Sequence, residues 1–326
     1  MRIVINGFGR IGRTVLRQIL TDPQHEDIEV VGINDIAPLE TCAYLFKYDS
    51  TFGPLPAKLE TTDNGLVVNG LSIPATREAD LSLLDLTGVD VVLECTGKVS
   101  ARHIAERGLK AGARAVLIAG PSEYADVTAV MGANEDTIGK TQIVSNSSCT
   151  TNAIAPLFRM LDAGLGIERA HVTTIHCVTG SQPMVDAPRG DLARSRAGGE
   201  SMVPTTTSAA QELARILPEI GPRISVSAVR VPCLSVSAID AVLQINAPSD
   251  TSVVEFLRSL AEQSPVIGVT EDACVSRDLR ARPESLILAL PETIVSGQQV
   301  RVFGWYDNEW GFSARMIEMA GLLAER

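Results

Sequence analysis

The sequence predicts an α/β protein with two domains, and three observations support this. Its 326 residues exceed the length of one typical domain. In the first half, short apolar segments rich in Val and Ile alternate with segments of helical periodicity. A glycine-rich turn directly follows the first apolar segment. Alternation of this kind is typical of a doubly wound parallel sheet covered by helices on both faces.

Composition narrows the class of protein. The hydrophobic content of 45% and charged content of 21% are ordinary for a globular chain. The net charge of −11 gives no general attraction to nucleic acid or to an anionic membrane, so neither is expected as a partner. We find no signal-peptide pattern and no apolar run near the roughly 18–20 residues that span a bilayer, so a cytoplasmic protein is expected. The six cysteines show no metal-ligand spacing, which predicts free thiols and no metal site.

The first element is a strand over residues 2–6, "RIVIN", followed by "GFGRIG" and the helical "RTVLRQIL". Gly7 permits the tight turn, Gly9 lets backbone approach a pyrophosphate, and Gly12 lets helix and strand pack closely. The free N–H groups at the start of the helix, around Arg10 and Ile11, favour a phosphate there. The pattern predicts a dinucleotide-binding Rossmann domain.

The second strand, "IEVVGIND", ends in Asn34 and Asp35, and Asp35 lies 23 residues beyond Gly12. An acid near this spacing hydrogen-bonds the ribose 2′-hydroxyl and repels a 2′-phosphate, which favours NAD over NADP. A later strand, "VDVVLECTG", ends at Thr96 and Gly97, at the sheet edge where ligands of such folds bind. A helix over residues 101–112 and the strands "RAVLIAG" and "QIVSNSS" continue the alternation.

Cys149 follows the last of these strands, in "SNSSCTTN", and opens a helical segment, "TTNAIAPLFRMLDAGLG". A helix N-terminus lowers the pKa of a thiol, so a reactive thiolate is expected. In the next strand, "AHVTTIHCVTG", alternation places Val172, Thr174 and His176 on one face and His171 on the other. His176 is the best available base, although its spacing from Cys149 does not by itself exclude a structural histidine.

Longer motifs then identify a resemblance. "INGFGRIGR", "LFKYDSTFG", "SNSSCTTN", "TTIHCVTGSQ", "DAPRGDLARSR", "VPTTTSAA", "AVRVP" and "WYDNEWGFSARM" occur in this order along the chain. The chain is similar to the phosphorylating glyceraldehyde-3-phosphate dehydrogenases from its first residues to its last helix. The resemblance implies an NAD-binding Rossmann domain over 1–148 and a catalytic domain with a large, mostly antiparallel sheet over 149–310. It also implies a C-terminal helix over 311–326 that packs back on the NAD-binding domain.

The same resemblance implies a chemistry. Cys149 attacks the aldehyde of D-glyceraldehyde 3-phosphate, and His176 pairs with the thiolate and takes the hydroxyl proton of the hemithioacetal. Hydride transfer to NAD leaves a thioester, which inorganic phosphate converts to 1,3-bisphosphoglycerate. The resemblance adds Arg77, Ala119 and Asn308 to the cofactor residues already named. The residues it implies for the substrate phosphate and inorganic phosphate are Ser148, Thr150, Thr179, Arg194, Thr207, Ser208 and Arg230. It further implies a glycolytic homotetramer.

Several positions depart from the family pattern. Ser208 stands where a glycine that helps form the inorganic phosphate site is usual in the family, and its Cβ could crowd the backbone there. Gly198 and Gly199 loosen a loop that in the family lies near a neighbouring subunit's cofactor. The changes at Ser208, Gly198 and Gly199 leave open the identity of the aldehyde and the efficiency of phosphorolysis. Ile36, after the acid, and Pro188 follow the pattern of members that use NAD.

Other hypotheses stay open from the sequence. An erythrose-4-phosphate dehydrogenase would share Cys149, His176 and the "DNEWGF" ending, and a paralogue using arsenate in place of phosphate is a further alternative. An RNA-binding protein on the same fold is disfavoured by the acidic charge. A redox sensor would need Cys149 but not His176, Asn308, Arg194 and Arg230, which are all present.

Overall fold

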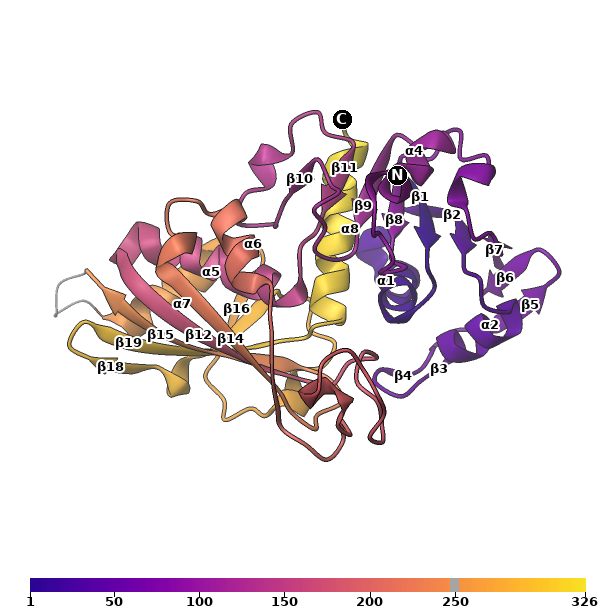
Figure 1. Ribbon diagram of the computed structural model, residues 1–326. Helices are drawn as coiled ribbons and strands as arrows, with labels where there is room; N and C mark the ends of the chain where they lie inside the picture. Colours follow the sequence, from indigo (N-terminus) through magenta and orange to yellow (C-terminus); the bar gives the residue numbers. More distant parts are fainter. Residues whose placement is uncertain (247–251) are drawn as a thin grey trace. The chain divides into compact units, whose positions relative to one another are not determined.

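The computed structural model describes residues 1–246 and 252–326, which fall into two compact units (Figure 1). The first unit comprises Met1–Ala129, Glu135–Ser148 and Ser313–Arg326. The second comprises Val130–Asn134 and Cys149–Phe312, apart from the undescribed residues.

The first unit is built on a nine-stranded sheet in the order β10-β11-β9-β8-β1-β2-β7-β6-β5. Every pairing from β10 to β7 is parallel, whereas β7, β6 and β5 pair antiparallel at one edge. The doubly wound parallel sheet predicted from the sequence is confirmed, with this antiparallel edge as an addition. The helix predicted over 101–112 is instead two single turns, α3 and α4, that meet at Glu106.

The strands of the first unit have these bounds: β1 (Arg2–Asn6), β2 (Glu29–Asn34), β3 (Tyr48–Asp49), β4 (Gly53–Pro54), β5 (Leu59–Thr62), β6 (Gly65–Val68), β7 (Leu71–Thr76), β8 (Val91–Glu94), β9 (Ala115–Ile118), β10 (Val127–Thr128) and β11 (Ile143–Ser145). Its helices up to β11 are α1 (Arg10–Thr21), α2 (Leu39–Lys47), α3 (Arg102–Ala105) and α4 (Arg107–Lys110). Short 3₁₀ turns lie at Pro23–His25, Leu81–Leu83 and Glu135–Ile138.

The last helix, α8 (Trp310–Ala324), begins in the second unit, and its residues from Ser313 onward belong to the first (Figure 1). The apolar face expected for it is buried, with no more than 4% exposure at Met316, Ile317, Met319, Ala320 and Leu323. An amphipathic helix at the end of the chain therefore contributes its apolar side chains to a core.

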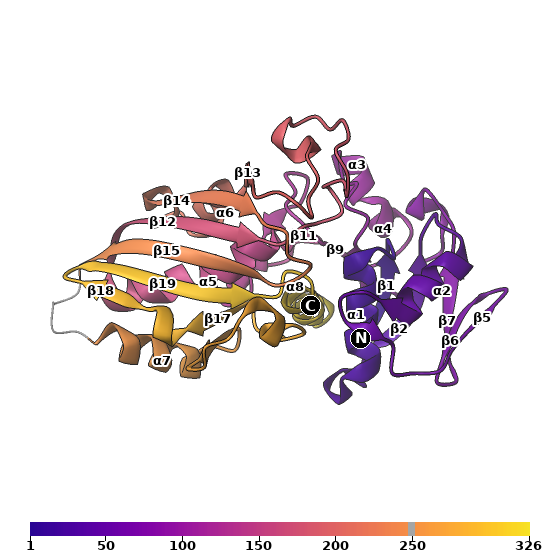
Figure 2. The ribbon, with the colours of Figure 1, turned by 90° about the horizontal axis from the view of Figure 1, so that it is seen from below.

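The second unit contains a large sheet in the order β13-β14-β12-β15-β19-β17-β16, with β18 paired to β19 (Figure 2). Its pairings are antiparallel except for β12 with β14 and β16 with β17. The mostly antiparallel sheet implied by the family resemblance is thus confirmed. The main core cluster of this unit joins buried residues of α5, α6 and α7 to those of the sheet, so these helices cover one face.

The remaining elements have these bounds: α5 (Cys149–Leu165), β12 (Ile167–His176), β13 (Val203–Thr205), α6 (Ala209–Ile216), β14 (Ile224–Arg230), β15 (Ser237–Ile245), α7 (Val253–Gln263), β16 (Ile267–Thr270), β17 (Leu286–Ala289), β18 (Ile294–Ser296) and β19 (Gln299–Tyr306). Short 3₁₀ turns lie at Ala193–Ser195, Gly221–Arg223, Ser276–Leu279 and Leu290–Glu292.

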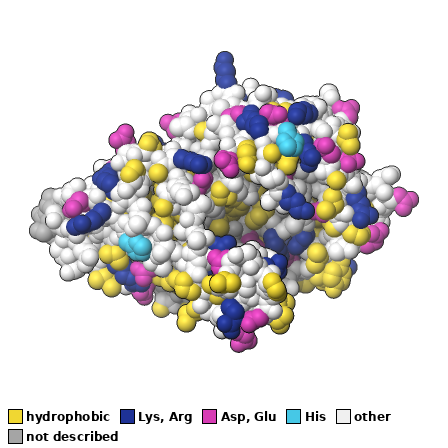
Figure 3. Space-filling model, in the orientation of Figure 1, with side chains coloured by type: hydrophobic (Ala, Val, Ile, Leu, Met, Phe, Trp, Pro, Cys, Tyr) yellow, Lys and Arg dark blue, Asp and Glu magenta, His cyan; other side chains and the backbone are white. Residues whose placement is uncertain are grey.

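The surface carries charges of both signs. On the face drawn in Figure 3, Lys and Arg side chains are interspersed with Asp and Glu. None of the helices in the described part of the chain has the length and apolar character needed to cross a membrane.

Candidate active site and cofactor cavity

The glycine turn after β1 is built as the motif requires. Gly7 has a φ of +94°, and a Cβ there would lie 2.6 Å from the Thr96 backbone nitrogen. A Cβ on Gly12 would lie 2.2 Å from the Gly7 carbonyl oxygen, so only glycine lets α1 approach β1 this closely. A Cβ on Gly9, the N-cap of α1, would meet nothing within 4 Å, which leaves its backbone open to a ligand.

A cavity of about 540 Å³ lies beside this turn, at the carboxyl ends of β1, β2 and β8. Of the cofactor residues predicted from the sequence, five line it: Gly7, Gly9, Asn34, Asp35 and Thr96. Its other lining residues are Asn6, Ile36, Glu78, Ala79, Leu81, Glu94, Cys95, Lys98, Ser100, Ile104 and Arg107. A crevice at this edge of a parallel sheet is where such folds bind nucleotides.

The acid predicted to hold a ribose is fixed by the backbone. Asp35 Oδ2 accepts the Phe8 N–H at 2.6 Å, and Oδ1 accepts the Ala37 N–H at 2.8 Å. Asn34 donates to the side chain of Asn6 and to the Glu78 carbonyl. Because each carboxylate oxygen can accept more than one bond, Asp35 keeps acceptor capacity for ligand hydroxyls. With the open N-terminus of α1, these groups fit a dinucleotide.

The other predicted cofactor residues lie outside the cavity wall. Arg10 forms an ion pair with Asp49 at 2.5 Å, and Arg77 donates to the Ile36 carbonyl at the rim. The remaining predicted residues in this group are Ile11 and Gly12 in α1, Gly97 after β8, and Ala119 after β9. Sequence reasoning missed Glu94, a buried acid that accepts hydrogen bonds from Asn6 and Thr96 at the end of β8. The available signal in the sequence was the position of Glu94 directly after the apolar residues 91–93, at the carboxyl end of a buried strand.

In the second unit, the reactive side chains gather at one end of the large sheet. The register pairs His176, the last residue of β12, with Arg230, the last residue of β14. It also pairs Ser237, at the start of β15, with Tyr306, at the end of β19. Cys149, the first residue of α5, approaches the same end, and its Sγ lies 3.6 Å from His176 Nε2. The structure thus brings together the cysteine and histidine predicted from the sequence.

The tautomer of His176 follows from its neighbours. Its Nδ1 lies 2.8 Å from the Cys177 carbonyl oxygen, which can only accept, so Nδ1 carries the proton. Nε2 of the neutral ring is then an acceptor facing the Cys149 sulfur. Tyr306 contacts the ring edge-on, with centroids 6.1 Å apart. This arrangement orients the imidazole as a base toward the thiol.

Burial sets the protonation states of this pair. It is the largest influence on both groups, raising the pKa of the Cys149 thiol and lowering the pKa of His176 from 6.5 to about 4. The positive charge of Arg230 and hydrogen bonds from Thr150 and the Cys149 N–H act in the opposite direction on the thiol but are weaker. The N–H donors at the helix N-terminus lower the pKa of the thiol as expected, but desolvation outweighs them, so the expected net lowering is wrong. Both shifts favour the uncharged forms of the thiol and the imidazole.

Arg230 is partly buried and adjoins this pair. Its NH1 donates to the Cys177 carbonyl at 2.9 Å and lies 3.1 Å from His176 Nδ1. Because Nδ1 carries a proton, the two donors share the carbonyl rather than bonding each other. The arginine therefore has a partner inside the site, as its apolar sequence context predicted.

A buried network of three hydroxyl groups, from Tyr306, Thr150 and Thr174, packs beside the Cys149–His176 pair, and the sequence did not indicate it. The buried Tyr306 hydroxyl bonds Thr150 Oγ1 at 2.9 Å and Thr174 Oγ1 at 2.7 Å. It therefore joins the first turn of α5 to β12. Thr150, predicted to bind phosphate, is only 4% exposed, and its hydroxyl is engaged with Tyr306. No local pattern links these residues, because Tyr306 lies 156 positions from Thr150.

Asn308 lies in the turn between β19 and α8. Asp307 holds this turn, since its carboxylate accepts the backbone N–H groups of Ala281, Glu309 and Trp310. The Asn308 side-chain oxygen accepts a hydrogen bond from the Cys177 thiol at 3.1 Å. The predicted nicotinamide contact is thus buried beside the residue that follows the base.

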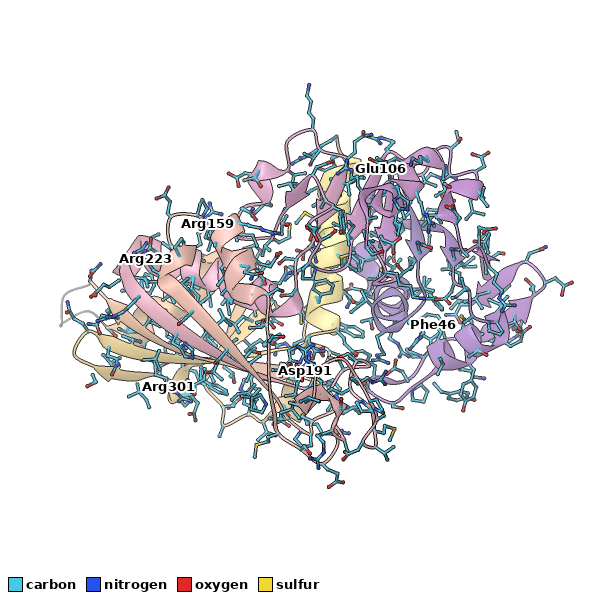
Figure 4. All side chains as sticks on the ribbon, viewed as in Figure 1. Phe46, Glu106, Arg159, Asp191, Arg223 and Arg301 are labelled. Carbon is cyan, nitrogen blue, oxygen red and sulfur yellow. The ribbon has the colours of Figure 1, made fainter. Side chains whose placement is uncertain are left out.

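The predicted anion-binding side chains come mainly from the loop between β12 and β13 and from the start of α6. Arg194 donates to Thr205 and to the Thr206 carbonyl, and its backbone N–H donates to the Asp191 carboxylate. Asp191 is labelled in Figure 4. Thr179 Oγ1 lies 2.9 Å from Ser181 Oγ. Arg196, by contrast, pairs with Asp186 in an exposed contact.

The substituted positions of the phosphate region show no strain. Ser208 has φ −83° and ψ −3°, an ordinary helical conformation that any residue adopts, so glycine is not required there. Thr207 Oγ1 accepts the Ala209 N–H at the start of α6. Ser148 is half-buried directly before Cys149. The concern that the Ser208 Cβ would distort this backbone is not supported.

Comparison with known proteins identifies the family of the chain. Residues 1–102 match "Glyceraldehyde 3-phosphate dehydrogenase, NAD binding domain", and residues 148–308 match the C-terminal domain of the same family. The chain is 43% identical to the glyceraldehyde-3-phosphate dehydrogenase of Pseudomonas aeruginosa, covering 99% of this chain and 98% of that protein. It is 40% identical to the enzyme of the same name from Geobacillus stearothermophilus, covering 100% and 99%, respectively. The chain belongs to the glyceraldehyde-3-phosphate dehydrogenase family.

Proposed function

We propose that this chain is an NAD-dependent, phosphorylating glyceraldehyde-3-phosphate dehydrogenase. The observation that carries the proposal is the contact between Cys149 Sγ and His176 Nε2, at 3.6 Å. The other ring nitrogen of His176, Nδ1, is fixed as a donor to the Cys177 carbonyl. A nucleophile with an oriented base at one end of a sheet suits covalent catalysis on a carbonyl. The names of the relatives, which align over the full chain, supply the substrate.

In this mechanism Cys149 is activated when it reacts rather than at rest. As the sulfur attacks the aldehyde carbon, its proton passes to His176 Nε2, and a carbon–sulfur bond forms a hemithioacetal. The backbone N–H of Cys149 is a donor for the developing oxyanion. His176 returns this proton to the oxyanion, which gives the hydroxyl of the hemithioacetal, and takes it again as the carbon loses hydride and becomes a thioester. Attack by a phosphate oxygen breaks the carbon–sulfur bond, and the leaving sulfur regains the proton from His176 as the thiol.

Bound NAD supplies the acceptor for the hydride. The cavity residues Gly7, Gly9, Asn34, Asp35 and Thr96 would hold its nucleotide part, with Arg10, Ile11, Gly12, Arg77, Gly97 and Ala119 as supporting residues of the same region. Asn308 would receive the carboxamide of the nicotinamide. The fixed carboxylate of Asp35 would accept from a ribose hydroxyl and disfavour a 2′-phosphate.

The charged ends of the reactants would be held by arginines and hydroxyls. Arg230 lies beside the reacting pair and can neutralise a phosphate there. We assign Thr179, Arg194 and Arg230 to the substrate phosphate. We assign Ser148, Thr207, Ser208 and again Arg194 to inorganic phosphate, with Thr150 acting through its bond to Tyr306.

The proposal includes the assembly and division of labour implied by the family. Residues 1–148 would form the NAD-binding domain, 149–310 the catalytic domain, and 311–326 the returning helix. We further propose a cytoplasmic homotetramer with a glycolytic role. Light scattering of the purified protein tests the tetramer, and a monomer would contradict it.

A steady-state assay tests the reaction. Glyceraldehyde 3-phosphate and erythrose 4-phosphate are compared as substrates, each with phosphate, with arsenate, and with neither. We expect phosphate-dependent NADH formation from glyceraldehyde 3-phosphate. Strong, phosphate-independent oxidation of erythrose 4-phosphate alone would instead indicate the related dehydrogenase. Cys149→Ser should abolish turnover while NAD still binds.

The cofactor is tested in the same assay. The efficiency kcat/KM with NAD should exceed that with NADP by at least about tenfold, because Asp35 repels a 2′-phosphate. Equal efficiencies would contradict the assigned role of Asp35.

A further inference from the structure

Cys177 contacts three residues predicted for the site, His176, Arg230 and Asn308, although it was not itself predicted as a functional residue. It directly follows His176 and is fully buried. Its carbonyl oxygen accepts from His176 Nδ1 and from Arg230, and its backbone N–H donates to Ser237 Oγ at 3.1 Å. Its thiol donates to Asn308 Oδ1 at 3.1 Å. The backbone of Cys177 therefore orients the base, while its side chain contacts the amide of Asn308.

The Cys177 thiol determines which end of the Asn308 side-chain amide faces the sulfur. The two ends of an Asn amide are an acceptor oxygen and a donor nitrogen, and exchanging them requires a rotation of 180°. Burial is the largest of the causes that raise the pKa of the Cys177 thiol to about 12, with smaller contributions from Cys149 and Glu309, so the group stays protonated and acts as a donor. A protonated sulfur is best satisfied by the oxygen of Asn308.

The nitrogen end is left for a ligand. Within residues 1–246 and 252–326, the Cys177 thiol is the hydrogen-bond partner of the Asn308 side chain, and its Nδ2 donates to no described group. A primary amide nitrogen with two free N–H groups complements a carboxamide oxygen.

We propose that Cys177 is a positioning residue that holds the Asn308 amide with its oxygen toward the sulfur, leaving the nitrogen to donate to the carboxamide of NAD. This inference rests on the proposed function, which assigns Asn308 to the nicotinamide. Cys177 acts only through Asn308 and touches neither substrate nor cofactor.

Binding measurements on the full-length protein test the inference without relying on turnover. The Kd values of NAD and ADP-ribose are measured by calorimetry for the wild type, Cys177→Ala and Cys177→Ser. ADP-ribose lacks the nicotinamide and so reports on the rest of the site. Cys274→Ala, which removes a partly buried thiol that bonds Thr270 and not Asn308, is the matched control.

In Cys177→Ala the Kd of NAD should rise about fivefold to twentyfold, because the amide loses the donor that orients it, while the Kd of ADP-ribose changes less than about twofold. Cys177→Ser keeps a donor and should remain within about threefold of the wild type for NAD. In an Asn308→Ala background, Cys177→Ala should have no further effect, since a residue acting through another is non-additive with it.

An unchanged Kd of NAD in Cys177→Ala, or an equal weakening of ADP-ribose, would overturn the positioning role. Additive effects with Asn308→Ala would overturn it as well. These results are distinct from failure of the proposed function, in which the wild type itself would neither bind NAD nor oxidise the aldehyde. If Cys177→Ala does not fold, Cys177→Val, which also removes the donor but fills the space of the thiol, replaces it in the same comparisons.

Discussion

The neutral state of His176 predicts how stability depends on pH. The groups that face the ring are Cys149 from α5, Arg230 from β14 and Tyr306 from β19. Burial and the arginine lower its pKa from 6.5 to about 4. Between these values the unfolded chain binds a proton at this histidine that the folded protein does not. Acidification through this window therefore stabilises the unfolded state relative to the folded state.

The magnitude follows from the same two values. A difference from 6.5 to about 4, at ~1.4 kcal/mol per pH unit, amounts to roughly 3 kcal/mol in full. The contribution is fully present above pH 7 and lost as the pH falls toward 4. Between pH 7 and pH 5 the loss amounts to about 2 kcal/mol.

The assay is urea unfolding of wild type and His176→Gln at pH 7, 6 and 5, at equal protein concentration. The free energy of unfolding of the wild type should fall by about 2 kcal/mol more than that of the variant over this range. Other titrating groups act on both proteins and largely cancel in the comparison. Equal slopes, or a wild type that gains stability relative to the variant on acidification, would refute the reasoning. The latter result would mean that the folded state holds an imidazolium paired with a thiolate.

Three further changes test the packing of the site. Tyr306→Phe removes both buried hydroxyl bonds, to Thr150 and Thr174, and should lower the free energy of unfolding by about 1–3 kcal/mol in urea titrations; no change would mean that the network is not stabilising. Gly12→Ala places a Cβ 2.2 Å from the Gly7 carbonyl oxygen and should lower the free energy of unfolding by about 1–3 kcal/mol in the same titration. The control Gly9→Ala, whose Cβ would meet nothing within 4 Å, should lower it by less than about 1 kcal/mol. Similar losses in the two variants would contradict the close approach of α1 to β1. Ser208→Gly should leave the KM for phosphate within about twofold, because residue 208 already has a helical conformation; a much lower KM would show that the serine Cβ crowds the anion.

The amino-acid sequence by itself determined the local architecture. The glycines at 7, 9 and 12 predicted the turn and the cavity beside it, because each position requires a specific backbone property. Alternation along "AHVTTIHCVTG" predicted that His176 and His171 lie on opposite faces of one strand, because successive side chains of a strand point to opposite faces. The structure confirms this, with His176 on the buried face and His171 on the exposed face. The helical spacing after Cys149 likewise placed this cysteine at the start of α5.

Tertiary structure alone decided the state and surroundings of these groups. Whether the Cys149 thiol ionises depends on how deeply the fold buries it, and desolvation reversed the expectation drawn from the helix N-terminus. Tyr306, which supports the site, comes from a strand more than 100 residues away, and the Cys177 thiol bonds an amide equally distant in the chain. Periodicity is a property of neighbouring residues, whereas burial and long-range hydrogen bonds arise only when distant strands are set side by side in register.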